Sequence, residues 1–347
     1  MTPARDAAPG RASSTDGARR VVVLAGGVGA ARFLRGVVRA TPPEHVTAIV
    51  NTGDDRVFYG VHVSPDLDIV AYTLAERIDR QRGFGLEGDR FDLVDRLAAL
   101  GHETWFRLGD ADYANCLHRT LRLAAGAGLD EVTDELRRDL GLALRLLPMS
   151  NDPCPTFVAL EGGARVHFEE YLVRDGAPTD VVSVDLSAAE AASPAPGVAL
   201  AIAAADVILV APSNPVVSIG PILAVRGVRE ALASSGAPIV AVSPIVGGAP
   251  IKGPAHTLLR ALGCEVSALG VARFYADWID GFVFDERDAA LQPAIEALGL
   301  ESEALDTMMV DARVSEAVAR AALGVAERVA RRRRGAAGTA RSRGASR

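Results

Sequence analysis

The sequence predicts an α/β protein whose central parallel sheet is covered by helices on both faces. Short segments rich in Val, Ile and Leu recur along the chain, as at 21–25, 207–210 and 239–242. Segments with the apolar spacing of helices lie between them, and each apolar segment is followed by a loop of glycine and small polar residues. Continuous apolar strands that alternate with helices are typical of parallel sheets buried on both faces. Ligands of such sheets bind beyond the carboxyl ends of the strands.

The N-terminal half contains two clear strands and a long helical segment. Residues 1–19 are rich in Ala, Gly, Pro and Ser, which predicts a disordered tail. From their periodicity and turn residues we expect, in order, a strand at 21–25, a glycine turn and helix at 26–41, a strand at 46–52, a helix at 68–78, a largely helical insertion at about 79–150, and an extended pair of strands at 163–173.

The C-terminal half alternates more regularly. We expect a strand at 205–210, a helix at 221–236, a strand at 237–242, a helix at 253–263, strands at 281–288 and 305–311, and a helix at 313–333. Residues 20–330 therefore form one predicted domain. The segment 331–347 carries seven arginines and no acid, which predicts a basic, disordered tail.

Composition excludes several classes of protein. The apolar share of 49% and the mean hydropathy of +0.18 exclude a disordered chain. No apolar segment approaches the roughly 20 residues that span a bilayer, and three separated cysteines imply neither a disulfide framework nor a metal site. The net charge is −7, and removing the seven charges of the tail leaves −14 for residues 1–330. We therefore expect a cytoplasmic protein that binds neither membranes nor nucleic acid.

Three loops that follow predicted strands are suited to phosphate groups. Gly26, Gly27 and Gly29 open a helix, where backbone N–H groups and the helix dipole favour an anion. The segment is not a dinucleotide fingerprint, because position 32 is Arg, and it lacks the Lys of a P-loop. A tight turn that binds nothing is the alternative.

The other two loops repeat this pattern after later strands. Hydroxyl, amide and N–H groups at a helix entrance suit phosphate oxygens, although ordinary capping is an equal alternative. A lysine at a helix start is better explained by an anion than by stability, although a solvated lysine remains an alternative. The candidate phosphate-binding residues are Ser213, Asn214, Pro215 and Ser218 in one loop, and Gly247, Lys252 and Gly253 in the other.

Four aspartates gather in the segment 51–68, between the second strand and the next helix. Asp54 and Asp55 follow the strand, and Asp66 and Asp68 lie at the helix start. Asp68 alone would serve as a helix cap, but capping needs one acid rather than four. Carboxylates beside phosphate-binding loops indicate Mg²⁺, which takes one or two carboxylates together with phosphate oxygens and water. We assign Asp54, Asp55 and Asp66 as candidate metal ligands.

Eight segments together resemble the 2-phospho-L-lactate transferase family of coenzyme F-420 biosynthesis. They occur in family order between about residues 21 and 310 and read GGVGAARFLRG, VNTGDD, SPDLD, RLGDAD, LPMSNDP, APSNPVVSIGPIL, SPIVGGAPIKGPA and FYADWIDGFVFDERD. The resemblance implies a Rossmann-like, three-layer α/β fold with an added helical region, usually as a homodimer. It also implies that Asp68, Arg107 and Asp110 contact the deazaflavin Fo.

The resemblance implies a Mg²⁺-dependent transferase. It implies that the donor is a guanosine-diphosphate-activated phospho-acid and that the acceptor is Fo. The reaction would release GMP and form F-420-0 or its dehydro form. We hypothesise that Asp54, alone or with Asp55, holds the metal and that an aspartate of the cluster accepts the proton of the attacking hydroxyl. Asp54 and Asp68 are the catalytic candidates, and the sequence does not determine which aspartate is the base. The donor acid stays open among phospholactate, phosphoenolpyruvate and 3-phosphoglycerate: the segment at 275–288 is similar to archaeal members, whereas the Ala- and Arg-rich tails favour a high-GC bacterium.

Two rival interpretations remain at this point. A regulatory family resembling the gluconeogenesis factor shares the fold and binds a UDP-sugar, but its acidic loop continues into Gly- and Ser-rich sequence, unlike DDRVFYG here. A nicotinamide-dependent dehydrogenase would need an acid at the end of the second strand, where this chain has Asn51. Neither a nucleophile elbow nor a convincing Cys/His pair indicates covalent catalysis.

Overall fold

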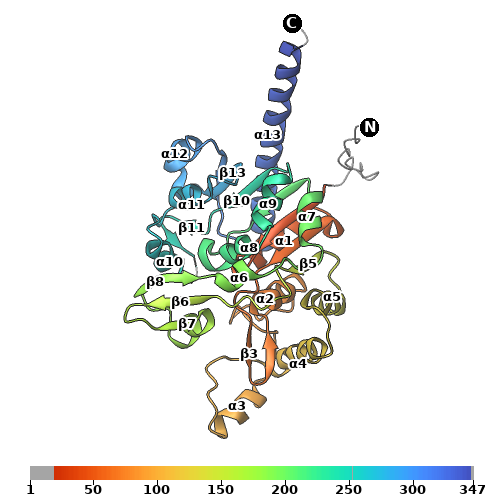
Figure 1. The fold of residues 1–347 in the computed structure, drawn as a ribbon, viewed down its shortest axis with the longest axis vertical. Coiled ribbons are helices and arrows are strands. Elements are labelled where there is room, and N and C mark those ends of the chain that lie inside the picture. The colour runs from red at the N-terminus through yellow and green to blue at the C-terminus, as the bar shows by residue number, and fades with distance from the viewer. Residues whose placement is uncertain (1–18, 252, 345–347) are drawn as a thin grey trace, which may run out of the picture.

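A parallel sheet forms the centre of the molecule in this computed structural model, which describes residues 19–251 and 253–344 (Figure 1). Within these residues the sheet has seven strands in the order β14-β13-β10-β9-β1-β2-β5. Their bounds are β1 Val21–Ala25, β2 Val46–Val50, β5 Arg145–Pro148, β9 Val207–Val210, β10 Ile239–Val242, β13 Gly281–Asp285 and β14 Glu301–Leu305. The predicted α/β class with a parallel sheet is confirmed. Strand β1 lies between β2 and β9, so the order of the strands reverses there.

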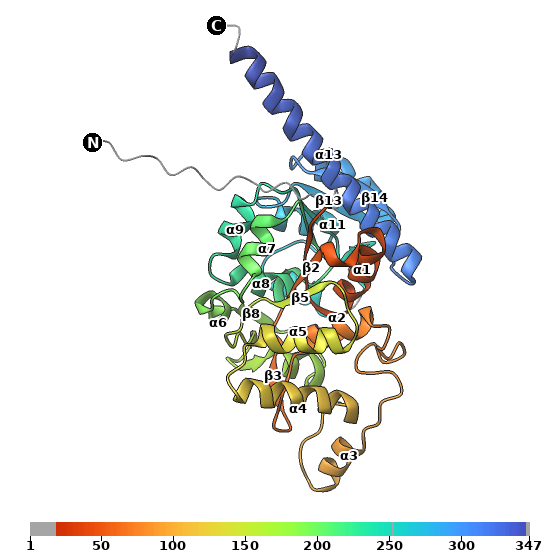
Figure 2. The ribbon, with the colours of Figure 1, turned by 90° about the vertical axis from the view of Figure 1, so that its right-hand side faces the viewer.

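Four helices cover one face of the sheet. They are α1 (Gly27–Ala40), α2 (Pro65–Leu74), α5 (Leu129–Asp139) and α13 (Ala312–Gly344). Phe33 and Leu34 of α1 and Val318 of α13 are fully buried against the odd-numbered residues of β1. Helix α1 packs closely on α13, because a Cβ atom at Gly36 would lie 2.0 Å from the carbonyl oxygen of Ser315. Figure 2 shows α13 crossing this face and continuing beyond the body.

Shorter elements cover the opposite face. Its helices are α6 (Ser187–Ala191), α7 (Val198–Ala204), α8 (Gly220–Ala224), α9 (Val228–Ser234), α10 (Ala255–Ala261), α11 (Ala268–Tyr275) and α12 (Gln292–Glu296). A small antiparallel sheet completes this layer, with β7 (Arg165–His167), β6 (Phe157–Leu160) and β8 (Val181–Asp185). Buried Ile, Leu, Val and Tyr side chains join these elements to β9, β10 and β13 in one core.

The insertion between β2 and β5 builds a lobe at the carboxyl edge of the sheet. It contains the hairpin β3 (Arg56–Phe58) and β4 (Val61–Val63), followed after α2 by α3 (Asp92–Ala99), α4 (Asp110–Ala124) and α5. Phe58, Val63, Leu108 and Cys116 share a separate small core there. Figure 1 shows α3 at the far end of this lobe from the central sheet. No described helix is both long and apolar enough to cross a bilayer.

Several predicted boundaries are wrong. Residues 145–148 lie in the segment predicted as helical but form edge strand β5, because four residues are too few for periodicity to separate a strand from a helix. The helix predicted at 221–236 is two helices, since Gly227 adopts φ +81° and interrupts it. The strand predicted at 305–311 lies earlier, as β14 (Glu301–Leu305).

Other segments depart from prediction in kind. Within 163–173, only Arg165–His167 is a strand, and the π-helix η2 (Glu170–Arg174) follows it. A second π-helix, η3 (Pro215–Ile219), precedes α8. The described part of the segment predicted as a disordered basic tail, residues 331–344, continues α13. The tail predicted at 1–19 lies outside the described residues except for Arg19, which pairs with Glu327.

Candidate functional site

A cavity of about 580 Å³ opens at the carboxyl edge of the sheet, as expected for a parallel α/β fold. The segments that follow β1, β2, β9, β10 and β14 line it, together with α2, residues 83–85, residues 105–108 and the start of η2. Most of the motifs that the sequence singled out therefore meet in one space, although they are spread over more than 200 residues.

The glycine loop after β1 fits tightly between its neighbours. Gly26, Gly27 and Gly29 all line the cavity. A Cβ atom at Gly26 would lie 2.8 Å from Asp66 Oδ2, and one at Gly29 would lie 2.4 Å from the carbonyl oxygen of Pro212. Helix α1 begins at Gly27, whose N–H hydrogen-bonds Asp66, and this start of the helix lines the cavity, where the helix dipole favours an anion.

The loop after β9 brings hydroxyl and amide groups to the same place. Ser213, Asn214 and Ser218 line the cavity, and the Ser213 hydroxyl oxygen accepts a hydrogen bond from the Gly26 N–H at 3.3 Å. Asn214 Oδ1 accepts from the Val216 N–H at 2.9 Å and thereby caps η3. The capping and ligand-binding interpretations of Asn214 are thus compatible, because its amide nitrogen has no capping role. Pro215 starts η3 and does not line the cavity.

The third predicted phosphate loop contributes only in part. Gly253 lines the cavity, whereas Lys252 lies outside the described residues. Gly247 lies in the hairpin of β11 (Ile245–Val246) and β12 (Ala249–Pro250), away from the cavity. Its N–H donates to Asp288 Oδ2 at 2.8 Å, so the donor we had assigned to phosphate is used within the fold.

Asp54 and Asp66 face each other across Asn51. The side-chain amide of Asn51 donates to Asp66 Oδ2 at 2.9 Å and to Asp54 Oδ1 at 3.3 Å. Both carboxylates line the cavity and are at most 6% exposed. Asp66 also accepts from the Gly27 N–H, so the donors to these two buried carboxylates are neutral amides, and a cation would supply the charge that they lack.

Asp55 points the other way. Its Oδ2 accepts from Ser64 Oγ at 2.7 Å and lies 3.0 Å from His62 Nε2. Asp55 does not line the cavity. The structure therefore separates Asp55 from Asp54 and Asp66, the other two residues assigned as metal ligands, because successive residues of the turn face opposite sides.

Glu169 is a further acid of the cavity that the sequence did not reveal. It lines the cavity just before η2, is 5% exposed, and its carboxylate has no hydrogen-bond partner among the described residues. Burial raises its pKa to about 8, with repulsion from Asp66 as the next cause. Burial also raises the pKa of Asp66 to about 7 and the pKa of Asp54 well above its usual range, the latter with repulsion from Asp66 and Glu169.

These pKa shifts predict an unusual pH dependence of the free energy of unfolding when a chelator keeps the protein free of metal ions. A buried acid whose pKa is raised on folding binds more protons in the folded state, so stability falls as pH rises through its window. We expect the free energy of unfolding to fall by a few kcal/mol, on the order of 1.4 per pKa unit, as the pH rises from the ordinary pKa of these acids, about 4, to about 8, the pKa of Glu169 in the folded state. Chemical denaturation at a series of pH values would measure this, and Glu169→Gln should flatten the slope. A flat or rising profile for the unaltered chain would contradict the prediction.

Asp68 forms a buried ion pair. Both of its carboxylate oxygens accept from the guanidinium of Arg119 on α4, with Nη1 to Oδ2 at 3.1 Å. Asp68 lines the cavity, and Arg119 lies behind it, 2% exposed. Ligand atoms of Asp68, Asp112 and Cys116 lie within 4.8 Å of one another, but the guanidinium already supplies the positive charge there.

The insertion supplies an apolar end to the cavity. Trp105, Phe106 and Phe84 line it, and Arg107 lies beside them with its guanidinium 4.6 Å from the ring centre of Phe91. Asp110, which we had assigned to the same contact, does not line the cavity. Its carboxylate accepts from the backbone N–H groups of 92 and 93 and thereby holds the start of α3.

The segment after β14 closes another side of the cavity. Residues 307–310 line it, and Thr307 donates from both its backbone N–H and its hydroxyl to Asp285 Oδ2, at 2.9 and 2.8 Å. Asp285 is fully buried at the end of β13. Both aspartates of the motif FDERD therefore hold loops: Asp285 holds Thr307, and Asp288 holds Gly247.

Comparison with known proteins decides which family these features belong to. The model of the family described as 2-phospho-L-lactate transferase CofD matches residues 21–323. The chain belongs to the 2-phospho-L-lactate transferase family. The match includes every segment that lines the cavity, so the family and the site are carried by the same residues.

Named relatives of this 2-phospho-L-lactate transferase family member are enzymes. A phosphoenolpyruvate transferase of Streptomyces griseus is 47% identical over 315 residues, covering 89% of this chain and 99% of the relative. A 2-phospho-L-lactate transferase of Methanosarcina acetivorans is 39% identical over 309 residues, covering 89% and 100%. The chain is therefore a transferase of the phospho-group type, which supports neither the regulatory nor the dehydrogenase interpretation.

A solved structure shares the fold. The crystal structure of a UPF0052-family protein from Bacillus halodurans superposes with a TM-score of 0.60 at 20% identity, covering 87% of this chain and 98% of the other. At this identity the likeness concerns the fold alone.

Proposed function

We propose that this transferase moves a phosphoenolpyruvyl- or phospholactyl-type group from a guanosine-diphosphate-activated acid to the deazaflavin Fo and releases GMP. The single observation that carries the proposal is that one cavity combines an N–H- and hydroxyl-lined end, buried carboxylates and an aromatic end. A diphosphate suits the first, a divalent cation the second, and a flat tricyclic alcohol the third.

The transfer is a displacement at phosphorus. The terminal hydroxyl of the ribityl chain of Fo attacks the phosphorus distal to guanosine, and the bond from that phosphorus to the bridging oxygen breaks. GMP leaves with the bridging oxygen, and the hydroxyl proton passes to a base. Such reactions depend mostly on positioning and on stabilising charge. We assign the diphosphate to the N terminus of α1 and to Ser213 and Ser218, and the acceptor to Asp68 and Arg107.

The acids fit Mg²⁺. Asp54, Asp66 and Glu169 are buried and line the cavity, and Asp54 and Asp66 share the neutral amide of Asn51. Burial raises the pKa of all three acids, and no cation among the described residues pairs with them. Asp54 and Asp66 would hold the ion, with Glu169 close enough to contribute charge. When bound, Mg²⁺ would neutralise the diphosphate and stabilise the charge on the departing GMP.

We propose enolpyruvyl as the acid of the donor. Four phosphoenolpyruvate transferases of Streptomyces and Kitasatospora are 46–48% identical to this chain, whereas 2-phospho-L-lactate transferases of Methanosarcina are 37–40% identical. We further propose that the enzyme is a cytoplasmic homodimer, which light scattering would test.

One assay tests the proposed function. Purified enzyme is supplied with Mg²⁺, Fo and each guanylylated acid in turn, made from phosphoenolpyruvate, phospholactate or 3-phosphoglycerate. Chromatography measures GMP, and mass spectrometry identifies the deazaflavin product. We expect the dehydro form of F-420-0 from the enolpyruvyl donor to form fastest. A faster reaction with phospholactate would overturn the choice of acid, and no GMP release from any donor would overturn the function.

A further inference from the structure

Helix α4 buries an arginine directly behind the cavity. Arg119 is 2% exposed and does not line the cavity, so its guanidinium cannot touch a substrate there. It binds the carboxylate of Asp68 through two nitrogens, Nη1 to Oδ2 at 3.1 Å and Nη2 to Oδ1. A fork that contacts both oxygens fixes the plane of the carboxylate as well as its position.

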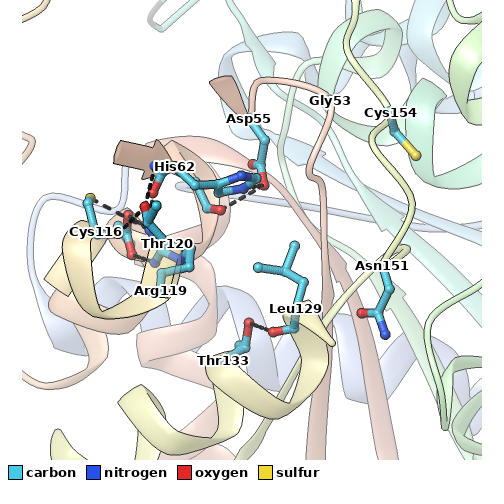
Figure 3. Close-up of polar contacts among 12 residues, drawn as sticks. Gly53, Asp55, His62, Cys116, Arg119, Thr120, Leu129, Thr133, Asn151 and Cys154 are labelled. Atoms are coloured by element: carbon cyan, nitrogen blue, oxygen red, sulfur yellow. Dashed lines mark hydrogen bonds and ion pairs between the residues drawn. The ribbon is translucent and has the colours of Figure 1, made fainter. Parts of the chain in front are cut away.

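The same turn of α4 also holds the strand beside the acidic loop. Arg119 Nη1 donates to the carbonyl oxygen of His62 at 3.3 Å, and the N–H of His62 donates to Thr120 Oγ1 at 2.7 Å. The ring of His62 in turn lies 3.0 Å from Asp55 Oδ2. Figure 3 shows His62 between Asp55 on one side and Arg119 and Thr120 on the other. Both ends of the segment that carries the acids, Asp55 and Asp68, are thus held from α4.

The neighbouring side chains of Asp112 and Cys116 do not fix the orientation of the Asp68 carboxylate. Asp112 lies close and its carboxylate accepts from the Tyr72 hydroxyl at 2.7 Å, so that pair is already matched. Cys116 Sγ contacts Arg119 rather than orienting Asp68. Within the described residues, the guanidinium is the one cation in contact with the Asp68 carboxylate.

We propose that Arg119 is the positioning residue of the acceptor site. It holds the Asp68 carboxylate in one orientation, so that an unshared lone pair faces the cavity and accepts a hydrogen bond from the hydroxyl-bearing acceptor. The inference rests on the proposed function, in which Asp68 contacts Fo. It assigns to α4 a role in acceptor recognition that is separate from donor binding, because no phosphate-loop residue that the structure describes forms a hydrogen bond with Arg119.

A double-mutant cycle tests the assignment. The variants are Asp68→Asn, Arg119→Met, the pair together, and Arg119→Lys, which keeps the charge but loses the fork. Arg122→Met is the matched control, because Arg122 lies on the same helix and forms a half-exposed ion pair with Glu135, and neither residue lines the cavity. Fluorescence of Fo gives its Kd, calorimetry gives the Kd of GDP, and steady-state rates give kcat and KM.

We expect Arg119→Met and Arg119→Lys to raise the Kd and KM of Fo by roughly 10- to 100-fold, the scale of a charge-assisted hydrogen bond. The Kd of GDP should change less than about threefold, because the phosphate loops are untouched. The double variant should bind Fo no more weakly than Asp68→Asn alone. Arg122→Met should behave as the unaltered enzyme in every measurement.

Contrary results are equally defined. Unaltered Fo affinity in Arg119→Met, or losses that add in the double variant, would reduce Arg119 to a structural ion pair. If Arg119→Met does not fold, the double variant and Arg119→Lys replace it, because neither leaves Asp68 as an unpaired buried charge. The role of Arg119 is then supported only if Arg119→Lys loses Fo affinity while retaining GDP affinity, and if the double variant binds Fo no more weakly than Asp68→Asn. Failure of the unaltered enzyme to bind Fo while it binds GDP would overturn the proposed acceptor and this inference with it.

Discussion

Replacing Asp54 by Asn is expected to lower kcat by about 100-fold or more, the scale of losing one preorganised electrostatic group in an active site. Asp54 is buried, lines the cavity and shares Asn51 with Asp66, so its charge belongs to the wall assigned to Mg²⁺. The amide preserves the shape of the side chain and removes the charge. The measurement is GMP release across a series of Mg²⁺ concentrations.

The Mg²⁺ series separates two explanations of a low rate. If Asp54 holds the metal, the variant should need a higher Mg²⁺ concentration for half-maximal rate, and binding of Mn²⁺ measured by electron paramagnetic resonance should weaken in parallel. Asp277→Asn is the control, because Asp277 is exposed just before β13, at the opposite edge of the sheet. Near-normal activity of Asp54→Asn would remove the role we assign to this residue.

Replacing Gly29 by Ala is expected to destabilise the fold and abolish tight donor binding together. The added Cβ atom would lie 2.4 Å from the carbonyl oxygen of Pro212, so α1 must move away from the loop after β9. Overpacking of this kind costs about 1–3 kcal/mol of unfolding free energy. Because the N terminus of α1 is assigned to the diphosphate, the Kd of GDP should rise by about 10-fold or more, the scale of losing one hydrogen bond to a charged group.

Gly324→Ala is the matched control for this substitution. Gly324 also lies within a helix, but its added Cβ would meet only the end of the Arg328 side chain at 3.9 Å. Alanine should therefore leave GDP binding unchanged and raise stability by up to about 1 kcal/mol through its better helix propensity. Comparable losses in both variants would mean that the contact of Gly29 with Pro212 is not the cause.

The parts of the fold that follow from local pattern were predictable. Strands β1, β2, β9 and β10 are continuous apolar segments bounded by glycine or polar turns, which marks buried parallel strands. Edge strands are harder to identify. Strand β14 reads ESEAL and β5 reads RLLP, so neither contains enough consecutive apolar residues to distinguish it from a helix or a loop.

The positions of site residues were predictable where a glycine motif determines the backbone. They were not predictable where only the direction of a side chain decides whether the residue lines the cavity. Gly26 and Gly29 are required by close approach, and both lie where the sequence placed them. Asp54 and Asp55 are adjacent, and only the turn geometry decides which of them faces the cavity. Glu169 follows a three-residue strand and carries no motif, and Arg119 lies in an amphipathic helix where an arginine usually indicates a solvated face.

Because the strand order reverses at β1, different stretches of the chain form different walls of the cavity. The loop after β1 and the segments on the β9 side, near 211–254 in sequence, supply the glycine- and hydroxyl-bearing wall. The segments on the β2 side, 51–174, supply the carboxylates and the aromatic wall, and residues 307–310 close another side. In the proposed assignment, the acceptor is met by the β2-side stretch, whereas the donor diphosphate is met mainly by the start of α1 and the loop after β9. Substitutions in one stretch can therefore change the specificity for one substrate and leave the other unchanged. A chimaera that takes only residues 76–125 from a relative should acquire that relative's acceptor specificity and keep its own donor specificity.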